Sequence, residues 1–155
     1  MIRSLTLVSV MTLVMYSCGK APVYEVDPEL LPYVNQFQGT AAQYGHSGTI
    51  SELVAKFGPM SNPRERAFCD LVDGEPPTVM VNAETWETLD EASRESLMFH
   101  ELGHCILKRV HMSERNSMGT PVSVMNPYAI DSETYEKHHD EYVAELFTGK
   151  KGVAN

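Results

Sequence analysis

The sequence predicts an α+β fold in which a small mixed β-sheet packs against two helices. Apolar residues between positions 28 and 44 recur at spacings of three and four, which predicts an amphipathic helix. The run 78–82 is rich in β-branched residues and is bounded by turn residues, which predicts a strand. Good helix formers continue from Arg94 without interruption to Gly103. A chain of 155 residues with 43% hydrophobic composition has the size of one domain.

The N-terminal segment has the pattern of an export signal. Arg3 supplies a positive charge, and the apolar stretch 5–16 that follows is too short to span a bilayer. The run Val14-Met15-Tyr16-Ser17-Cys18 resembles the lipobox of bacterial lipoproteins. The resemblance implies cleavage before Cys18 and acylation of its thiol. We therefore expect an exported bacterial lipoprotein, anchored to a membrane on the periplasmic or outer-membrane face.

This interpretation divides the chain into a signal peptide (1–17), a lipidated cysteine with its tether (18–27) and a folded domain (28–155). Export places Cys69 and Cys105 in an oxidising compartment. With Cys18 acylated they are the remaining pair, and we expect a disulfide between them.

The other elements follow in chain order. Residues 50–57 fit a strand or a short helix, and residues 67–72 fit a short strand. A capping box over 88–91 predicts the start of the second helix, which we expect to end near Lys108. A last helix is expected over 134–147.

The second helix carries an HExxH motif, His100-Glu101-Leu102-Gly103-His104. Histidines four residues apart lie on one face of a helix, so both imidazoles can bind one zinc ion. Glu101 lies beside that face and can act as general base towards a water molecule. This spacing predicts a zinc-dependent hydrolase with Glu101 as its catalytic residue.

The residues after this motif resemble those of the metzincin metallopeptidases. The segment Ser123-Val124-Met125-Asn126-Pro127 is similar to their Met-turn. With the Arg-x-His at 109–111, it also resembles small predicted metallopeptidase lipoproteins of bacteria, loosely from about residue 30 to residue 142. The resemblance implies that Met125 forms an apolar floor beneath the zinc. It also makes Tyr128 a candidate for oxyanion stabilisation, with simple packing as the alternative.

The third zinc ligand departs from the metzincin pattern HExxHxxGxxH. That pattern would place the glycine at Leu107 and the third histidine at Val110, whereas here His111 follows one residue later. We expect His111 to be the third ligand, because it is the first imidazole that the chain offers once the helix has ended. The alternatives left open are Glu141, Glu145, His138 and His139.

The predicted function is that of a zinc metalloendopeptidase, monomeric, that binds its peptide substrate as an extended strand along a sheet edge. The net charge of −9 and the absence of a Lys/Arg run argue against nucleic acid as a partner. Two other functions stay open: a non-catalytic metal-binding envelope lipoprotein, and a hydrolase of non-peptide amides in the cell wall.

Overall fold

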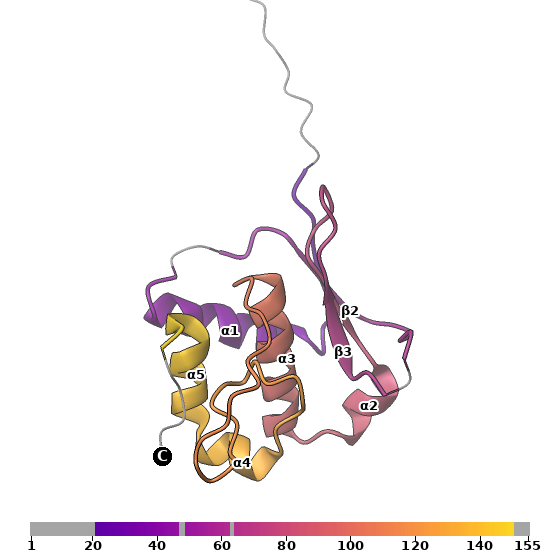
Figure 1. Ribbon diagram of the computed structural model, residues 1–155. Coiled ribbons are helices and arrows are strands. Elements are labelled where there is room, and N and C mark those ends of the chain that lie inside the picture. Colours follow the sequence, from indigo (N-terminus) through magenta and orange to yellow (C-terminus); the bar gives the residue numbers. More distant parts are fainter. Residues whose placement is uncertain (1–20, 47–48, 63, 151–155) are drawn as a thin grey trace, which may run out of the picture.

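The computed structural model describes residues 21–46, 49–62 and 64–150, which form two layers. A four-stranded sheet makes one layer, and α1, α3 and α5 lie together on one side of it (Figure 1). In this part of the chain the strands are β1 (Tyr24–Val26), β2 (Leu53–Phe57), β3 (Ala67–Asp70) and β4 (Thr78–Val81). The helices are α1 (Leu31–Gln43), α2 (Ala83–Thr88), α3 (Glu91–Cys105), α4 (Ser132–Lys137) and α5 (His139–Thr148). None of these described helices is both long enough and apolar enough to cross a bilayer.

The sheet is mixed, with the strand order β1-β2-β4-β3. The pairs β1–β2 and β2–β4 are parallel, and β3 runs antiparallel to β4. The predicted α+β class with a small mixed sheet is therefore confirmed. The expected strands over 67–72 and 78–82 are also confirmed, and the ambiguous segment 50–57 contributes strand β2.

Strand β3 forms one edge of the sheet and lies against α3. The carbonyl of Arg66 accepts a hydrogen bond from the N–H of Asn82, so backbone groups at every second residue from Arg66 point towards β4. The alternation directs the backbone N–H and C=O groups of Ala67 and Cys69 to the opposite side, away from the sheet. This edge carries backbone groups that can pair with other parts of the molecule or with a ligand.

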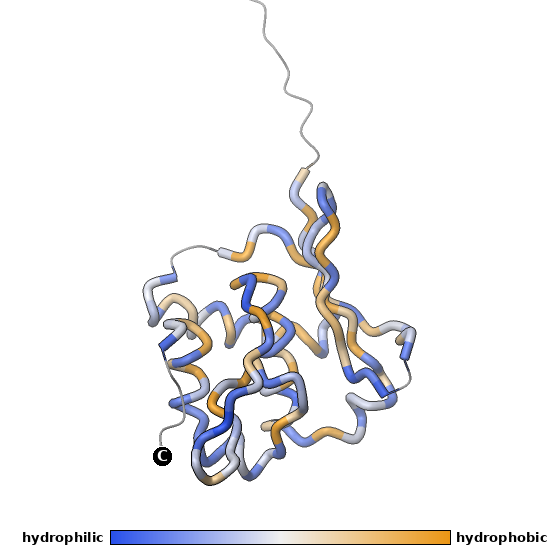
Figure 2. Tube along the Cα trace, in the orientation of Figure 1, coloured by the Kyte–Doolittle hydropathy of each residue, from blue (hydrophilic) through white to orange (hydrophobic). Residues whose placement is uncertain are grey.

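The core lies between the sheet and the helices, where hydrophobic residues follow the strands (Figure 2). Phe37 of α1 contacts Phe99 of α3 edge-on, with 5.3 Å between ring centroids, and Phe147 of α5 at 5.0 Å. Trp86 is buried, and its ring meets that of Tyr33. The aromatic contacts join α1, α3 and α5, so the helix that carries the HExxH motif is held from several sides.

Four details of the expected secondary structure were wrong. Residues 24–26 belong to the sheet, so that part of the predicted tether is folded. Helix α3 begins after Asp90, whose carboxylate accepts from the N–H of Ser93, whereas Thr88 ends α2. The same helix ends at Cys105 rather than near Lys108, because the chain turns away there. The last helix is divided at His138 into α4 and α5.

Candidate metal centre

Helix α3 presents the HExxH motif towards the long loop that connects it to α4. Its C-terminal half is covered by β3, and the disulfide between Cys69 and Cys105 joins the two elements, with 5.6 Å between the Cα atoms. The predicted disulfide is thus present. Because Cys105 directly follows His104, the crosslink holds the strand against the helix at the motif itself.

Two histidines of the motif are oriented by backbone carbonyls. The Nδ1 atom of His100 lies 2.8 Å from the carbonyl oxygen of Val124, and Nδ1 of His104 lies 2.6 Å from that of Arg109. A carbonyl oxygen only accepts hydrogen bonds, so both Nδ1 atoms must carry the proton. The Nε2 atoms therefore keep their lone pairs, as metal ligands require.

His111 approaches these two side chains from the loop. The turn that brings it back is made at Lys108, which has a left-handed backbone conformation with φ of 55°. The N–H of Arg109 then donates to the carbonyl of Gly103 at 3.0 Å. One residue after His111, the N–H of Met112 donates to the carbonyl of Met125 at 2.8 Å, which fixes this segment against the predicted Met-turn.

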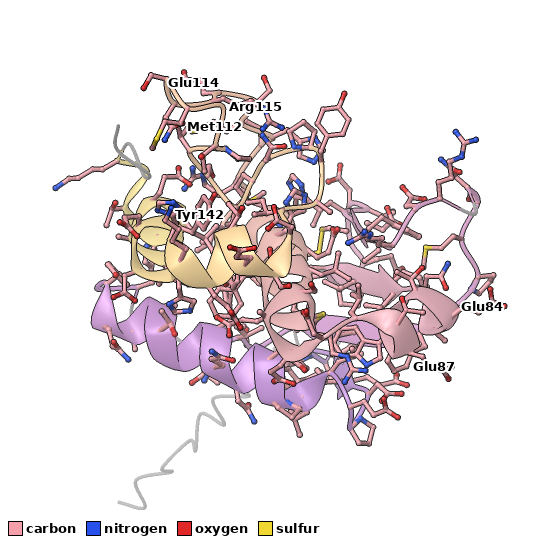
Figure 3. The ribbon with its side chains drawn as sticks, turned by 90° about the horizontal axis from the view of Figure 1, so that it is seen from below. Glu84, Glu87, Met112, Glu114, Arg115 and Tyr142 are labelled. Carbon is pink, nitrogen blue, oxygen red and sulfur yellow. A yellow bond between two sulfur atoms is a disulfide. The ribbon has the colours of Figure 1, made fainter. Side chains whose placement is uncertain are left out.

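The same loop continues over α5, where its outer part is also anchored. Figure 3 shows Met112, Glu114 and Arg115 on this loop, with Tyr142 next to it on α5. The hydroxyl of Tyr142 donates to the carbonyl of Pro121 at 3.0 Å. The outer part of this loop is therefore fixed to α5 although it has little regular secondary structure.

Among the described residues, one group gathers its ligand atoms as a metal site would: His100, His104 and His111, with these atoms within 4.8 Å of one another. The Nε2 atom of His100 lies 3.1 Å from Nε2 of His104 and 3.2 Å from Nε2 of His111. Ligands of a tetrahedral zinc at 2.0–2.1 Å are separated by about 3.3 Å. Two of the three separations are close to this value and the third lies within 4.8 Å, so the three imidazoles can hold a metal ion.

The electrostatic environment keeps the histidines of the helix neutral. Burial lowers the pKa of His100 to about 4, assisted by the neighbouring His104 and His111, although the Val124 carbonyl opposes this. Burial also lowers the pKa of His104. Neutral imidazoles are the form that binds metal ions, so the site is prepared for a cation at neutral pH.

Glu101 is 5% exposed and faces β3. Burial, and secondarily the charge of Glu65, raise the pKa of Glu101 to about 8, while a hydrogen bond from the backbone N–H of Cys69 lowers it. A cation held by the nearby histidines would act against the effect of burial and favour the carboxylate. The Cys69 N–H belongs to the free edge of β3, so the sheet orients the candidate general base.

A cleft passes the three histidines on both sides. One side is a cavity of about 360 Å³ between the start of β3, helix α3 and residues 124–130, and the other extends along β3 towards Val110. Tyr128 lines the first side with 72% of its surface exposed, so it contributes little to the core. Met125 is fully buried against Gly103, where a Cβ atom would come within 2.6 Å of its sulfur.

The alternative third ligands lie elsewhere. His138 lies 4.0 Å from Glu141, and both ring nitrogens of His139 face carboxylates, those of Glu95 and Asp140. The carboxylate of Glu145 is bound by Arg109 and Ser123. None of these four residues belongs to the histidine group within the described chain. The predicted lipidation site, Cys18, lies outside the described residues.

Sequence reasoning missed the residues that support this centre. In the sequence analysis Arg109 and Ser123 appear only as members of patterns, the Arg-x-His at 109–111 and the segment similar to a Met-turn. Both patterns contain the residue concerned, but neither indicates that its side chain binds Glu145. The hydrogen bond from Cys69 to Glu101 had no signal, because it depends on strand register.

A family model described as "Putative phage metallopeptidase" matches residues 34–147, from within α1 to within α5. The chain belongs to this family. The match supports a metallopeptidase-like protein, in agreement with the histidine group and with the metallopeptidase predicted from the sequence. Comparisons with curated proteins and with solved structures found no match.

Proposed function

We propose that this family member is a zinc-dependent metalloendopeptidase in which His100, His104 and His111 hold the metal. The observation that carries the proposal is the convergence of three Nε2 atoms, two of which have lone pairs fixed by carbonyl hydrogen bonds. When bound, zinc supplies a Lewis acid for the scissile carbonyl and lowers the pKa of a water molecule.

In this proposal Glu101 moves the protons. The Cys69 N–H fixes its carboxylate, and the buried setting strengthens its interaction with any proton donor. Glu101 accepts a proton from the attacking water and passes it to the leaving amine. Tyr128, exposed on the cleft wall, supplies a hydroxyl for the oxyanion once substrate is bound.

The substrate is proposed to be an extended peptide that pairs with β3. The N–H and C=O of Ala67 point away from β4 at the free edge of the sheet, and Ala67 lines both sides of the cleft. A peptide strand added there gains backbone hydrogen bonds while it passes the histidines. Leu71 and Val110, exposed along one side, offer apolar contacts to its side chains.

We further propose that the site is a metzincin-type arrangement displaced by one residue. In the metzincin pattern the turning glycine stands three residues before the last histidine. Here the left-handed residue is Lys108, again three residues before His111. The turn and the ligand have shifted together, which supports His111 as the counterpart of the third histidine.

The test is Glu101→Gln, measured on a peptide library and, in parallel, on cell-wall fragments. Zinc content should be retained, and hydrolysis of peptides should fall by about 10²–10⁴-fold because only proton transfer is removed. Glu141→Gln, at an exposed carboxylate, is the matched control and should behave as wild type. Zinc binding without any hydrolysis by the wild type would instead assign a non-catalytic metal-binding protein. Hydrolysis confined to cell-wall fragments would assign non-peptide amides.

We also propose that the protein is exported and anchored by a lipid on Cys18. The Cys69–Cys105 disulfide supports this, because such bonds persist in oxidising compartments. Cys18→Ser should move the protein from the membrane fraction to the soluble fraction after export. Unchanged membrane association of that variant would contradict the anchor.

A further inference from the structure

Glu145 of α5 is a buried carboxylate that the proposed reaction does not use. Only 1% of its surface is exposed, although it lies beside the metal-centre loop. A buried carboxylate is costly unless its oxygens are paired, and removing one partner of such a pair is strongly destabilising. Its partners therefore indicate which parts of the fold it holds in place.

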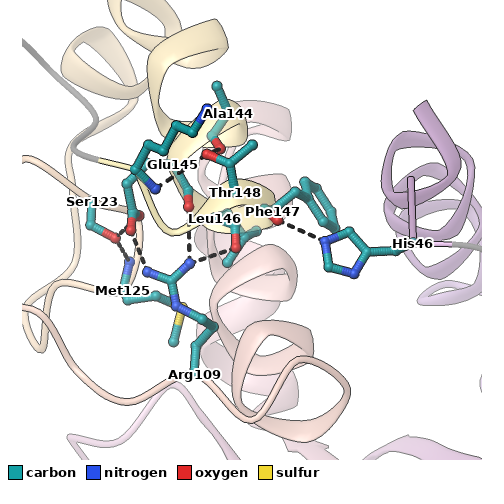
Figure 4. A network of polar contacts seen from close by, with 10 residues as sticks. His46, Arg109, Ser123, Met125, Ala144, Glu145, Leu146, Phe147 and Thr148 are labelled. Carbon is teal, nitrogen blue, oxygen red and sulfur yellow. Dashed lines mark hydrogen bonds and ion pairs between the residues drawn. The ribbon is translucent and has the colours of Figure 1, made fainter. Parts of the chain in front are cut away.

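The two carboxylate oxygens of Glu145 bind different segments of the loop (Figure 4). One oxygen accepts from Nη2 of Arg109, and the other accepts from the hydroxyl of Ser123. Nη1 of Arg109 also donates to the backbone carbonyls of Glu145 at 2.9 Å and Leu146 at 2.6 Å. One side chain thus joins α5 to both ends of the segment 109–123.

Each of these segments orients one histidine. The carbonyl of Arg109 itself accepts the hydrogen bond from Nδ1 of His104. Ser123 directly precedes Val124, whose carbonyl accepts from Nδ1 of His100. The two carbonyls that fix the protonation of His104 and His100 therefore belong to Arg109, which Glu145 binds, and to Val124, which follows the other residue it binds.

The link extends to the third histidine through the Met-turn. The hydroxyl of Ser123, while it donates to Glu145, accepts from the N–H of Met125 at 3.0 Å. The carbonyl of Met125 then accepts from the N–H of Met112, the residue after His111. The backbone segments that support the three histidines are thus all connected to the carboxylate of Glu145.

We propose that Glu145 is a positioning residue for the metal centre, acting through Arg109 and Ser123 on the carbonyls that orient His104 and His100. This inference rests on the proposed metal site. The carbonyls of Arg109 and Val124 lie outside the helices and strands, so their direction depends on the contacts that Arg109 and Ser123 make with Glu145. Loss of such outer partners typically lowers metal affinity by about 10–100-fold.

The test compares Ser123→Ala with Tyr142→Phe. Each variant removes one buried hydroxyl that links α5 to the same loop, but the Tyr142 hydroxyl binds Pro121, which orients no histidine. Zinc affinity is measured by competition with a chelator, and the ligand geometry by the visible spectrum of the Co²⁺-substituted protein. Ser123→Ala should lose about 10–100-fold in affinity and change the Co²⁺ spectrum. Tyr142→Phe should leave both unchanged.

A conservative variant of Arg109 guards against a loss of folding. Arg109→Lys keeps the positive charge beside Glu145 but cannot reproduce the two-pronged contact, and it should weaken zinc binding as Ser123→Ala does. Equal affinities and spectra in wild type, Ser123→Ala and Arg109→Lys would overturn the inference. So would equal losses in Ser123→Ala and Tyr142→Phe, which would mean general loop stability. Failure of the wild type to bind zinc would instead overturn the proposed function.

Discussion

The histidines of α3 and its loop contrast with the adjacent pair His138 and His139, at the junction of α4 and α5. In the first group the partners of Nδ1 are neutral backbone carbonyls, those of Val124 and Arg109. In the second group the partners are carboxylates: Glu141 lies beside His138, and Glu95 and Asp140 lie beside the two nitrogens of His139. The same residue type thus meets opposite electrostatic environments within one small domain.

The contrast shows how the partner decides the role of a histidine. Burial lowers the pKa of His100, so its imidazole stays neutral and keeps a lone pair. Burial also acts downwards on His139, but hydrogen bonds to Asp140 and Glu95 outweigh it and raise its pKa. A histidine such as His139, whose two ring nitrogens both contact carboxylates, presents no free lone pair to a metal ion. Adjacent histidines in a sequence are therefore weaker indicators of a metal site than histidines with carbonyl partners.

The largest expected effect is a loss of zinc affinity when a histidine of the first group is removed, with no loss when one of the second group is removed. His111→Ala should lower zinc affinity by more than the roughly 100-fold that an outer partner is worth, because it removes a direct ligand. His139→Ala should leave zinc affinity unchanged, since both of its nitrogens face carboxylates. Chelator competition measures both values. A collapse of zinc affinity in His139→Ala would invalidate the comparison.

The next largest effect compares two links to α3, the disulfide beside the first group and the ion pair of His139 in the second group. The disulfide closes a loop with a sequence separation of 36 residues, and its loss should cost about 2–4 kcal/mol of unfolding free energy. Cys69→Ser/Cys105→Ser, compared with wild type in urea denaturation with and without reductant, measures this cost. Loss of the partly exposed Glu95–His139 pair should cost less than about 1 kcal/mol. Equal unfolding free energies for the double variant and the wild type would show that the disulfide contributes nothing.

A smaller effect is the pH dependence of the unfolding free energy that His139 of the second group contributes. The pKa of His139 is raised in the folded protein, so its ion pairs stabilise the fold below the ordinary histidine pKa of about 6.5. That stabilisation is lost as the pH rises through the folded-state value. The difference in unfolding free energy between wild type and His139→Gln should therefore be larger at about pH 5.5 than at about pH 8.5. A difference that stays constant, or grows with pH, would contradict the direction assigned here.

The smallest effect concerns the turn before His111. Lys108 has a positive φ, which costs a side-chain-bearing residue about 1 kcal/mol or more. Lys108→Gly relieves this strain but loses the hydrogen bond from Nζ to the carbonyl of Cys105. Thermal unfolding should show a net stabilisation of up to about 1 kcal/mol, with zinc affinity retained. A marked loss of zinc affinity would show that the lysine side chain supports the centre directly.

The sequence predicted the fold class and the positions of its elements because their signals are local. Periodicity located α1, and β-branched residues located β4. The HExxH spacing alone puts His100 and His104 on one face of α3. The contribution of His111 depends on a left-handed turn at Lys108, a conformation for which the sequence offers no glycine.

Other features of the centre arise only when distant segments meet. The sequence offered Glu145 as an alternative ligand, but its carboxylate is occupied by two groups that lie 36 and 22 positions away. Likewise, the backbone partner of Glu101 follows from the register of β3 with β4. Such contacts are set by tertiary packing, which no local pattern encodes.

Zinc X-ray absorption spectroscopy of the purified wild-type protein tests the central claim most directly. One zinc per chain, with three imidazole nitrogens and one further light atom at about 2.0–2.1 Å, is the predicted result. The His111→Ala protein should show one imidazole fewer. A chain that takes up no zinc when it is supplied, or a zinc with the same three imidazoles after His111 is removed, would contradict the account.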